Sequence, residues 1–183
     1  MLSRAVSSFY GVSKASNVVV VKLPVEVGPE GEHYFFQSSL FEGLTQIRDD
    51  IISHKIPPGK GVINMSLASP ANGGLHEKML MNTLRSLIKE FTERDIPVVA
   101  GSGDRARESR HEDIDSYPAL FGSDKSLSII VVGSTNIWGM RSSFSPGSKN
   151  DRCLTTSAVG EQVRCPPASG LEKEVVVSGT SEC

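Results

Sequence analysis

Short runs of β-branched and other apolar residues alternate along the chain with segments in which apolar residues recur every three or four positions. Runs of the first kind predict strands, and the second spacing places apolar side chains on one face of a helix. The predicted strands cover residues 17–22, 61–67, 96–100, 127–133 and 174–177. The first of them, NVVVVK, is typical of a strand that is buried on both faces.

The helical segments have recognisable ends. The first is predicted to start near Ser39, with Ser38 or Ser39 as its N-cap, and to stop before the proline pair at 57–58. The second is predicted over residues 76–94. Strands that alternate with helices of this length predict βαβ units, and hence a parallel sheet that helices cover on both faces.

Small residues follow three of the predicted strands, in the segments MSLASP, AGSGD and SGTS. Because chemistry in such folds collects at the carboxyl ends of the strands, we expect these segments to share one rim of the sheet and one site. The charged segment 104–117 and the Ser/Gly/Pro-rich chain between 133 and 174 are predicted to be irregular.

Segments spread over most of the chain resemble the subtilisin-like serine proteases. They are GVSKASNVVVVK (11–22), VINMSLASP (62–70), PVVAGSGD (97–104), SLSIIVVGSTNIWGMRSSFSPG (126–147) and SGTS (178–181). Their order and spacing agree with the family over residues 11–181. The resemblance implies an α/β three-layer sandwich with a mostly parallel sheet, subtilisin-like and incomplete, and a single partial subtilase (peptidase S8) domain over residues 1–183.

The resemblance also implies the roles of individual residues. Ser181 occupies the position of the nucleophile, and Asp104 that of the asparagine that binds the oxyanion. The residues implied to bind a peptide or protein substrate form two walls, with Ser66, Leu67 and Ala68 in one and Gly101, Ser102 and Gly103 in the other. In this family the first wall pairs with the substrate backbone as an added strand.

The chain lacks partners for that serine. Acyl transfer by a serine hydroxyl requires a histidine as base and a carboxylate that orients it. In the family both precede the segment that matches 11–22, yet the first ten residues contain neither Asp nor His. None of the four histidines, His33, His54, His76 and His111, has an HGTH-like context. His76 follows the MSLASP loop, but nothing in the sequence directs its ring at Ser181.

Asp104 and the end of the chain weigh against hydrolysis as well. An ionised carboxylate only accepts hydrogen bonds, and it repels a negative charge about 4 Å away by roughly 4 kcal/mol at an effective dielectric of about 20. Relatives that carry Asp here leave activity open. Only Glu182 and Cys183 follow Ser181, which predicts no helical turn and a frayed end. We therefore predict that the isolated chain does not hydrolyse peptides.

Composition excludes other classes of protein. A net charge of −2 and a pI near 6.1 argue against a nucleic-acid partner. Apolar runs are too short to cross a membrane, and the N-terminus lacks the apolar core of a secretory signal. No Cys or His spacing suits a metal, and no cofactor is predicted. Among the three cysteines, Cys153 and Cys165 are candidates for a bridge, and three reduced thiols are the alternative.

Other interpretations remain open at this point. The chain is equally compatible with a non-catalytic relative, a pseudoprotease that keeps the peptide groove. Gly101, Gly103 and Ala106 form G-x-G-x-x-A after a strand, which is a weak match to a dinucleotide-binding loop. The HEDID stretch at 111–115 is a candidate metal site or, more simply, a solvated charged loop.

Overall fold

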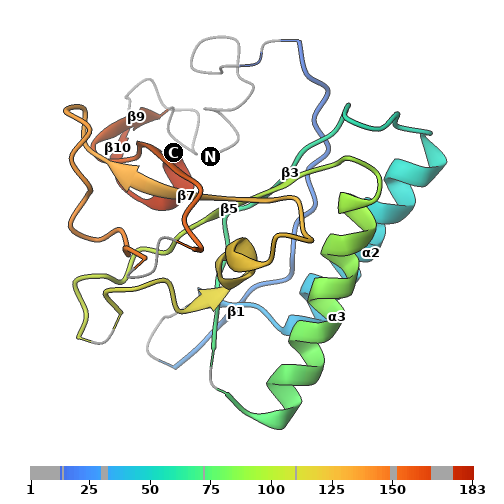
Figure 1. Cartoon of the computed structure of the whole chain (residues 1–183), viewed down its shortest axis with the longest axis horizontal. Coiled ribbons are helices and arrows are strands. Elements are labelled where there is room, and N and C mark those ends of the chain that lie inside the picture. Colours follow the sequence, from blue (N-terminus) through green and yellow to red (C-terminus); the bar gives the residue numbers. More distant parts are fainter. Residues whose placement is uncertain are drawn as a thin grey trace.

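A four-stranded parallel sheet with the strand order β3-β5-β7-β8 forms the centre of the protein (Figure 1). Its strands are β3 (Ile63–Met65), β5 (Val98–Gly101), β7 (Ile129–Thr135) and β8 (Thr156–Val159). The computed structural model describes residues 13, 15–29, 33–71, 73–109, 111–148, 152–165 and 175–183. The predicted α/β class with a mostly parallel sheet is confirmed.

The two faces of this sheet differ in polarity and burial. Its register aligns the buried positions in two rows across the strands: Ile63, Val98 and Ile129, then Met65, Ala100 and Val131. The row between them is Asn64, Val99 and Ile130, of which Asn64 is exposed and the others are half-buried. Because successive side chains point to opposite faces, one face carries the core and the other is less covered.

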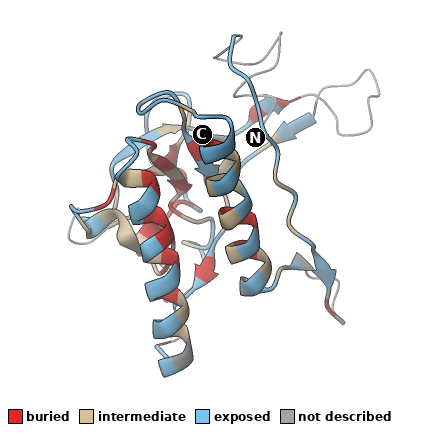
Figure 2. Ribbon diagram, turned by 90° about the vertical axis from the view of Figure 1, so that its right-hand side faces the viewer, coloured by how far each residue is buried: buried red, intermediate tan, exposed pale blue. Residues whose placement is uncertain are grey.

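Helices α2 (Gln37–Ser53) and α3 (Leu75–Thr92) both pack against the core face, and their buried sides face inward (Figure 2). The helix predicted over 76–94 corresponds to α3. Their buried hydrophobic residues are Leu40, Leu44 and Ile51 from α2, and Met81, Leu84, Leu87, Ile88 and Phe91 from α3. Full burial of each large apolar side chain stabilises the fold by about 1.5–3 kcal/mol.

The start of α2 corrects the predicted N-cap. The helix begins at Gln37, and Phe36 rather than Ser38 or Ser39 occupies the N-cap position without a side-chain hydrogen bond. The carbonyl of Phe36 accepts hydrogen bonds from the backbone amides of Ser39 and Leu40 at 3.0 and 3.3 Å. Backbone hydrogen bonds, rather than a side-chain cap, therefore define the start of this helix, and Ser38 and Ser39 lie inside its first turn.

The apolar run at 17–22 is not a strand, contrary to the prediction. Val19 and Val20 are 66% and 68% exposed, and the extended chain runs alongside α2 and β3 (Figure 1). A cavity of about 190 Å³ lies between its Val21 and Ile63 of β3. β-branched composition favours extended backbone, but a strand also needs a neighbour that takes up its hydrogen bonds.

The last predicted strand is present but does not join the parallel sheet. β10 (Val175–Val177) pairs antiparallel with β9 (Val163–Cys165), with Val176 opposite Arg164. The stretch between 133 and 174, which was predicted to be irregular, contains β8 and β9. β8 has the sequence TSAV and is mostly exposed, so it shows no apolar alternation that would have revealed it.

Short ribbons surround the sheet. β1 (Glu26–Val27) pairs with β2 (His33–Tyr34), and β4 (Ser69–Pro70) pairs with β6 (Ser116–Tyr117), both antiparallel. The 3₁₀ helix η1 (Ala119–Ser123) follows β6 and packs against β7. The β4–β6 pairing joins the charged segment 104–117 to the end of the MSLASP loop.

No disulfide bond links Cys153, Cys165 or Cys183, so the bridge considered between Cys153 and Cys165 is not formed. Within the described ranges, no helix combines the length and the apolar character that crossing a membrane requires.

Candidate functional site

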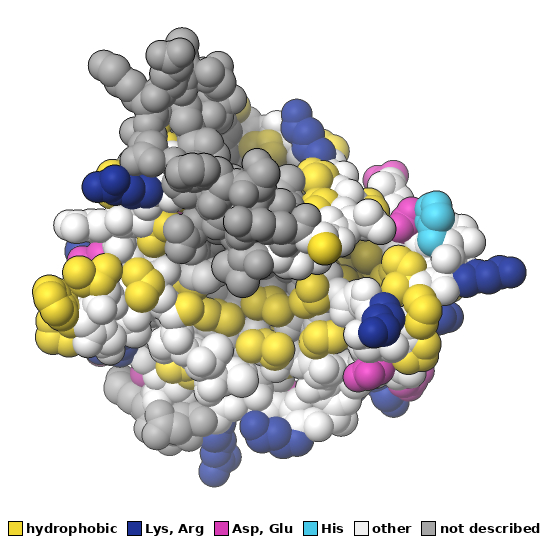
Figure 3. All heavy atoms as spheres, turned by 90° about the horizontal axis from the view of Figure 1, so that it is seen from above, with side chains coloured by type: hydrophobic (Ala, Val, Ile, Leu, Met, Phe, Trp, Pro, Cys, Tyr) yellow, Lys and Arg dark blue, Asp and Glu magenta, His cyan; other side chains and the backbone are white. Residues whose placement is uncertain are grey.

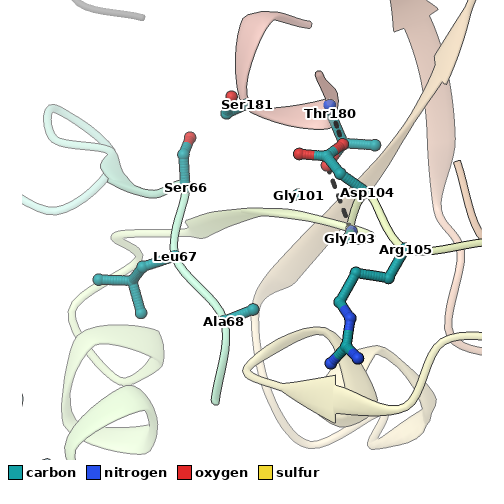
Figure 4. Close-up of a pocket in the computed structure, with 9 residues that line it drawn as sticks. All are labelled: Ser66, Leu67, Ala68, Gly101, Gly103, Asp104, Arg105, Thr180 and Ser181. Atoms are coloured by element: carbon teal, nitrogen blue, oxygen red, sulfur yellow. Dashed lines mark hydrogen bonds between the residues drawn. The ribbon is translucent and has the colours of Figure 1, made fainter. Parts of the chain in front are cut away.

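The three small-residue segments meet around one cavity of about 250 Å³ (Figure 4). The residues that line it are Ser66, Leu67, Ala68, Gly101, Gly103, Asp104, Arg105, Thr180 and Ser181. They come from the loop after β3, the turn after β5, and the 3₁₀ helix η2 (Thr180–Glu182). The expectation that these segments share one rim of the sheet is confirmed.

Hydrogen bonds join the SGTS segment to the turn after β5. The backbone amide of Thr180 donates to Asp104 Oδ1 at 2.6 Å, and the amide of Gly103 donates to Thr180 Oγ1 at 3.2 Å (Figure 4). The amide of Gly179 donates to the carbonyl of Gly160 at 2.9 Å. The antiparallel β9–β10 ribbon thus delivers SGTS to the rim that a parallel strand was expected to reach.

Ser66, Leu67 and Ala68 form an open backbone edge along one wall. No backbone hydrogen bond joins these residues to any other part of the chain that the structure describes. The Ser66 hydroxyl donates to Asn64 Oδ1 at 3.0 Å. Unpaired amide and carbonyl groups in extended chain are ready to pair with a further strand.

Asp104 acts as a hydrogen-bond acceptor in this site. Its Oδ1 receives the charge-assisted bond from Thr180, which is short at 2.6 Å. A carboxylate in this role cannot donate to an oxyanion, and its charge opposes the build-up of another negative charge nearby.

Ser181 does not lie on a frayed end, contrary to the prediction. It is the middle residue of η2, where the Glu182 amide donates to the carbonyl of Gly179 at 3.1 Å and Thr180 is buried. Among the described residues the Ser181 hydroxyl has no hydrogen-bond partner. In Figure 4 this side chain and that of Ser66 lie at the same end of the cavity.

Three placements differ from what sequence reasoning singled out. Ser102 does not line the cavity: it is 1% exposed, and its hydroxyl lies 3.3 Å from that of Ser145. Arg105 and Thr180 do line it and were not predicted. Alternation along the strand would have separated Ser102 from Gly101 and Gly103, and Thr180 lies beside the predicted Ser181.

The described histidines lie elsewhere. His54 Nδ1 is 3.1 Å from Asp50 Oδ1 at the end of α2, and His111 Nδ1 pairs with Asp115 Oδ2. The side chains of His33 and His76 lie outside the described residues. No imidazole is among the described side chains that line the cavity, so neither His54 nor His111 is in place to take the proton of Ser181.

The thiol nearest to this serine in sequence is not an activated nucleophile. Burial raises the pKa of Cys183, with nearby Asp104 and Glu182 acting in the same direction. Its Sγ donates to the carbonyl of Ala158 at 3.4 Å. Since the thiolate is the reactive form, this thiol stays protonated at neutral pH.

Two other kinds of site were considered from the sequence: a dinucleotide-binding loop and a metal site. No helix follows Gly101, Gly103 and Ala106 in residues 104–109, so the feature that would hold a pyrophosphate in a dinucleotide fold is missing there. No group of three or more His, Cys, Asp or Glu side chains in the described part of the chain is placed to hold a metal ion.

Comparison with solved structures supports the class of fold. The prenylagaramide maturation protease PagA matches with a TM-score of 0.57 and 17% identity, over 82% of this chain and 46% of its own. The nisin leader peptidase NisP from Lactococcus lactis matches with a TM-score of 0.58 and 16% identity, over 82% and 50%. The PatG macrocyclase domain matches with a TM-score of 0.56 and 20% identity, over 80% and 37%.

These neighbours define the fold as that of subtilisin-like protease domains, in agreement with the resemblance in the sequence. This chain spans half or less of the length of each of them. No protein-family profile and no curated protein sequence matches it.

Proposed function

We propose that this chain is a subtilisin-like domain that binds an extended peptide in the groove between residues 66–68 and 101–104. The observation that carries this proposal is the unpaired backbone of Ser66, Leu67 and Ala68 beside a cavity of about 250 Å³. A peptide laid along this edge forms main-chain hydrogen bonds, and a side chain of that peptide enters the cavity.

We further propose that the 183-residue chain on its own does not cleave the peptide it binds. A serine hydroxyl is a weak nucleophile without a neighbouring base, and the described lining contains no imidazole. Asp104 adds a negative charge where a tetrahedral intermediate needs donors. A second polypeptide that supplied a histidine and an aspartate would be required for serine protease chemistry.

Binding is tested with fluorescein-labelled ten-residue peptides and fluorescence anisotropy. N-methylation of alternate residues removes the amide donors on one side of an extended peptide. We expect at least tenfold weaker binding when the methyl groups occupy one set of alternate residues, and less than threefold change for the other set. Equal effects of both sets, or no binding by any peptide, would contradict the groove.

Catalysis is tested with a fluorophosphonate probe, which labels activated serines. We expect the purified chain to label no more than its Ser181→Ala variant, while an intact subtilisin-like protease labels stoichiometrically in the same buffer. Stoichiometric labelling that disappears in Ser181→Ala would show that the chain supplies its own base, and would refute the inactive assignment.

A further inference from the structure

A second cavity of about 130 Å³ opens from the peptide groove. Its lining consists of Ala68, Pro70, Gly103, Asp104, Arg105, Asp115, Ser116 and Pro146. Four of these residues, Ala68, Gly103, Asp104 and Arg105, also line the groove. The two spaces therefore adjoin, and a side chain of a peptide in the groove can enter the second one.

Ser116 presents an unused hydroxyl to this second cavity. The residue is 8% exposed, and its hydroxyl has no hydrogen-bond partner among the described residues. No side-chain oxygen or nitrogen in the described part of the protein is both sealed from solvent and unpaired, so this hydroxyl is open to the cavity. It lies 4.0 Å from the position that a Cβ on Gly103 would take.

Gly103 lines both cavities in a backbone conformation that favours glycine. Its φ of +109° lies in a region that residues with a side chain rarely adopt. A Cβ there would lie 3.5 Å from Pro146 and 4.0 Å from Ser116 Oγ, which are ordinary contact distances. An unpartnered, nearly buried hydroxyl that faces a cavity indicates a place for a ligand atom.

The charges around the second cavity favour a cation. Asp115 pairs with His111 through Oδ2, which leaves its Oδ1 without a partner in the described residues. Asp104 adds a second carboxylate. The one cation of the lining, Arg105, is held by Glu108, which accepts bonds from its Nε and NH2 nitrogens at 2.8 and 2.5 Å. Glu108 is thus the main partner of this guanidinium, Asp115 also interacts with it electrostatically, and Asp115 Oδ1 keeps acceptor capacity.

The remaining walls are apolar. Pro70 lies in β4 and Ala68 in the loop just before it, and Pro146 belongs to the loop after β7. Lysine and arginine side chains combine an aliphatic stem, which packs on such walls, with a charged end that seeks carboxylate and hydroxyl oxygens. An acidic side chain would meet like charge, and a purely aliphatic one would leave the Ser116 hydroxyl and Asp115 without a new partner.

We propose that this second cavity binds the basic side chain, lysine or arginine, of a peptide held in the groove, with Asp115 and Ser116 as the residues that determine this preference. The inference rests on the proposed peptide groove, and it names the class of peptide that the groove selects. Asp115 receives the charge and Ser116 accepts a hydrogen bond from the same ammonium or guanidinium group.

The test uses four fluorescein-labelled ten-residue peptides of one alanine- and threonine-based sequence, with lysine, acetyl-lysine, leucine or glutamate at the central position. We expect the lysine peptide to bind at least tenfold more tightly than the other three. Acetyl-lysine keeps the length of lysine and removes its charge, so this comparison requires no change in the protein. Raising the salt concentration should weaken the lysine peptide selectively.

Variants then locate the effect in the protein. Asp115→Asn keeps an acceptor for His111 and removes the charge, and we expect it to weaken the lysine peptide five- to tenfold while changing the leucine peptide less than twofold. Glu93→Gln makes the same change in net charge at the exposed end of α3 and should leave both unchanged. Ser116→Ala breaks no hydrogen bond in the described protein and should weaken the lysine peptide about threefold.

The outcomes separate this inference from the proposed function. If none of the peptides binds, the groove itself is wrong and the inference falls with it. If all four bind equally, the groove stands and the preference for a basic side chain is refuted. If the lysine peptide is preferred but neither Asp115→Asn nor Ser116→Ala reduces that preference, the second cavity is not its site.

Discussion

At position 101, the absence of a side chain lets the SGTS segment approach the end of β5. A Cβ on Gly101 would lie 2.8 Å from Thr180 Oγ1 and 3.4 Å from the carbonyl oxygen of Thr180. The same hydroxyl accepts the hydrogen bond from the Gly103 amide. The absence of a Cβ at Gly101 thus leaves room for the contact between Thr180 and the turn after β5.

The first prediction follows from this contact. Gly101→Ala should destabilise the protein by about 1–3 kcal/mol, because the added methyl group displaces Thr180 and its hydrogen bonds. Thermal unfolding followed by circular dichroism measures the change. Gly61→Ala is the matched control, since its Cβ would meet Ile96 at an ordinary 3.6 Å and should cost nothing. Equal melting temperatures for both variants would contradict the close approach.

At the scale of elements, hydrogen bonds connect α3 to the chain that leads into β7. Arg85 of α3 donates from Nε to Asp124 Oδ2 at 2.8 Å, and from a terminal nitrogen to Ser126 Oγ at 3.0 Å. Asp124 Oδ1 also accepts from the hydroxyl and the backbone amide of Ser126, at 2.6 and 2.9 Å. The carboxylate of Asp124 therefore connects α3 to the segment that leads into β7.

These contacts predict a dependence of stability on pH. The hydroxyl of Ser126, its amide and then Arg85 lower the pKa of Asp124 to about 2, from an ordinary 3.8. Because the folded state has the lower pKa, the stabilisation is complete above about pH 4 and is lost as the pH falls towards 2. Solvent screens this partly exposed pair, so the whole contribution is small.

Asp124→Asn should therefore lower the melting temperature at pH 7 by about 2–4 °C, the shift that roughly 1 kcal/mol produces in a protein of this size. The difference from the wild-type protein should shrink below pH 4 and vanish near pH 2. Calorimetry at a series of pH values measures it. A difference that stays constant from pH 7 to pH 2 would mean that the charge of Asp124 is not the cause.

At the scale of the whole molecule, the exposed apolar surface is the feature that bears on association between copies of the chain. Figure 3 shows yellow apolar side chains in a broken band across the face seen from above. The large apolar residues with the greatest exposure include Val19, Val20, Leu75, Ile137 and Trp138. Unpaired extended segments that are rich in β-branched residues are prone to pair with other copies of the chain.

We expect Val20→Lys to suppress association between copies of the chain through the 17–22 segment. Light scattering on heating at fixed concentration should show later and weaker aggregation than for the wild-type chain, with the melting temperature unchanged because Val20 is 68% exposed. Val62→Lys makes the same change at a 64% exposed position outside the 17–22 segment and should protect less. Equal protection by both variants would assign the effect to net charge alone.

Much of the architecture follows from local patterns in the sequence. The spacing of Leu84, Leu87 and Phe91 predicted α3 within a few residues, and the apolar runs of β3, β5 and β7 predicted the strands of the parallel sheet. These elements bury large side chains on one face, and such burial leaves a periodic trace in the sequence. The order of the small-residue segments likewise predicted which loops would meet.

Other features depend on partners that are distant in sequence. The run at 17–22 has the composition of a strand and lacks a neighbour to pair with, while β8 has little apolar character and pairs at the edge of the sheet. β10 pairs with β9 rather than with β7, and the hydrogen bond from Thr180 to Asp104 then joins the SGTS segment to the groove. Side-chain periodicity thus specifies the helices and core strands, whereas hydrogen-bond partners, which exist only once the chain has folded, decide the sheet edges and the site.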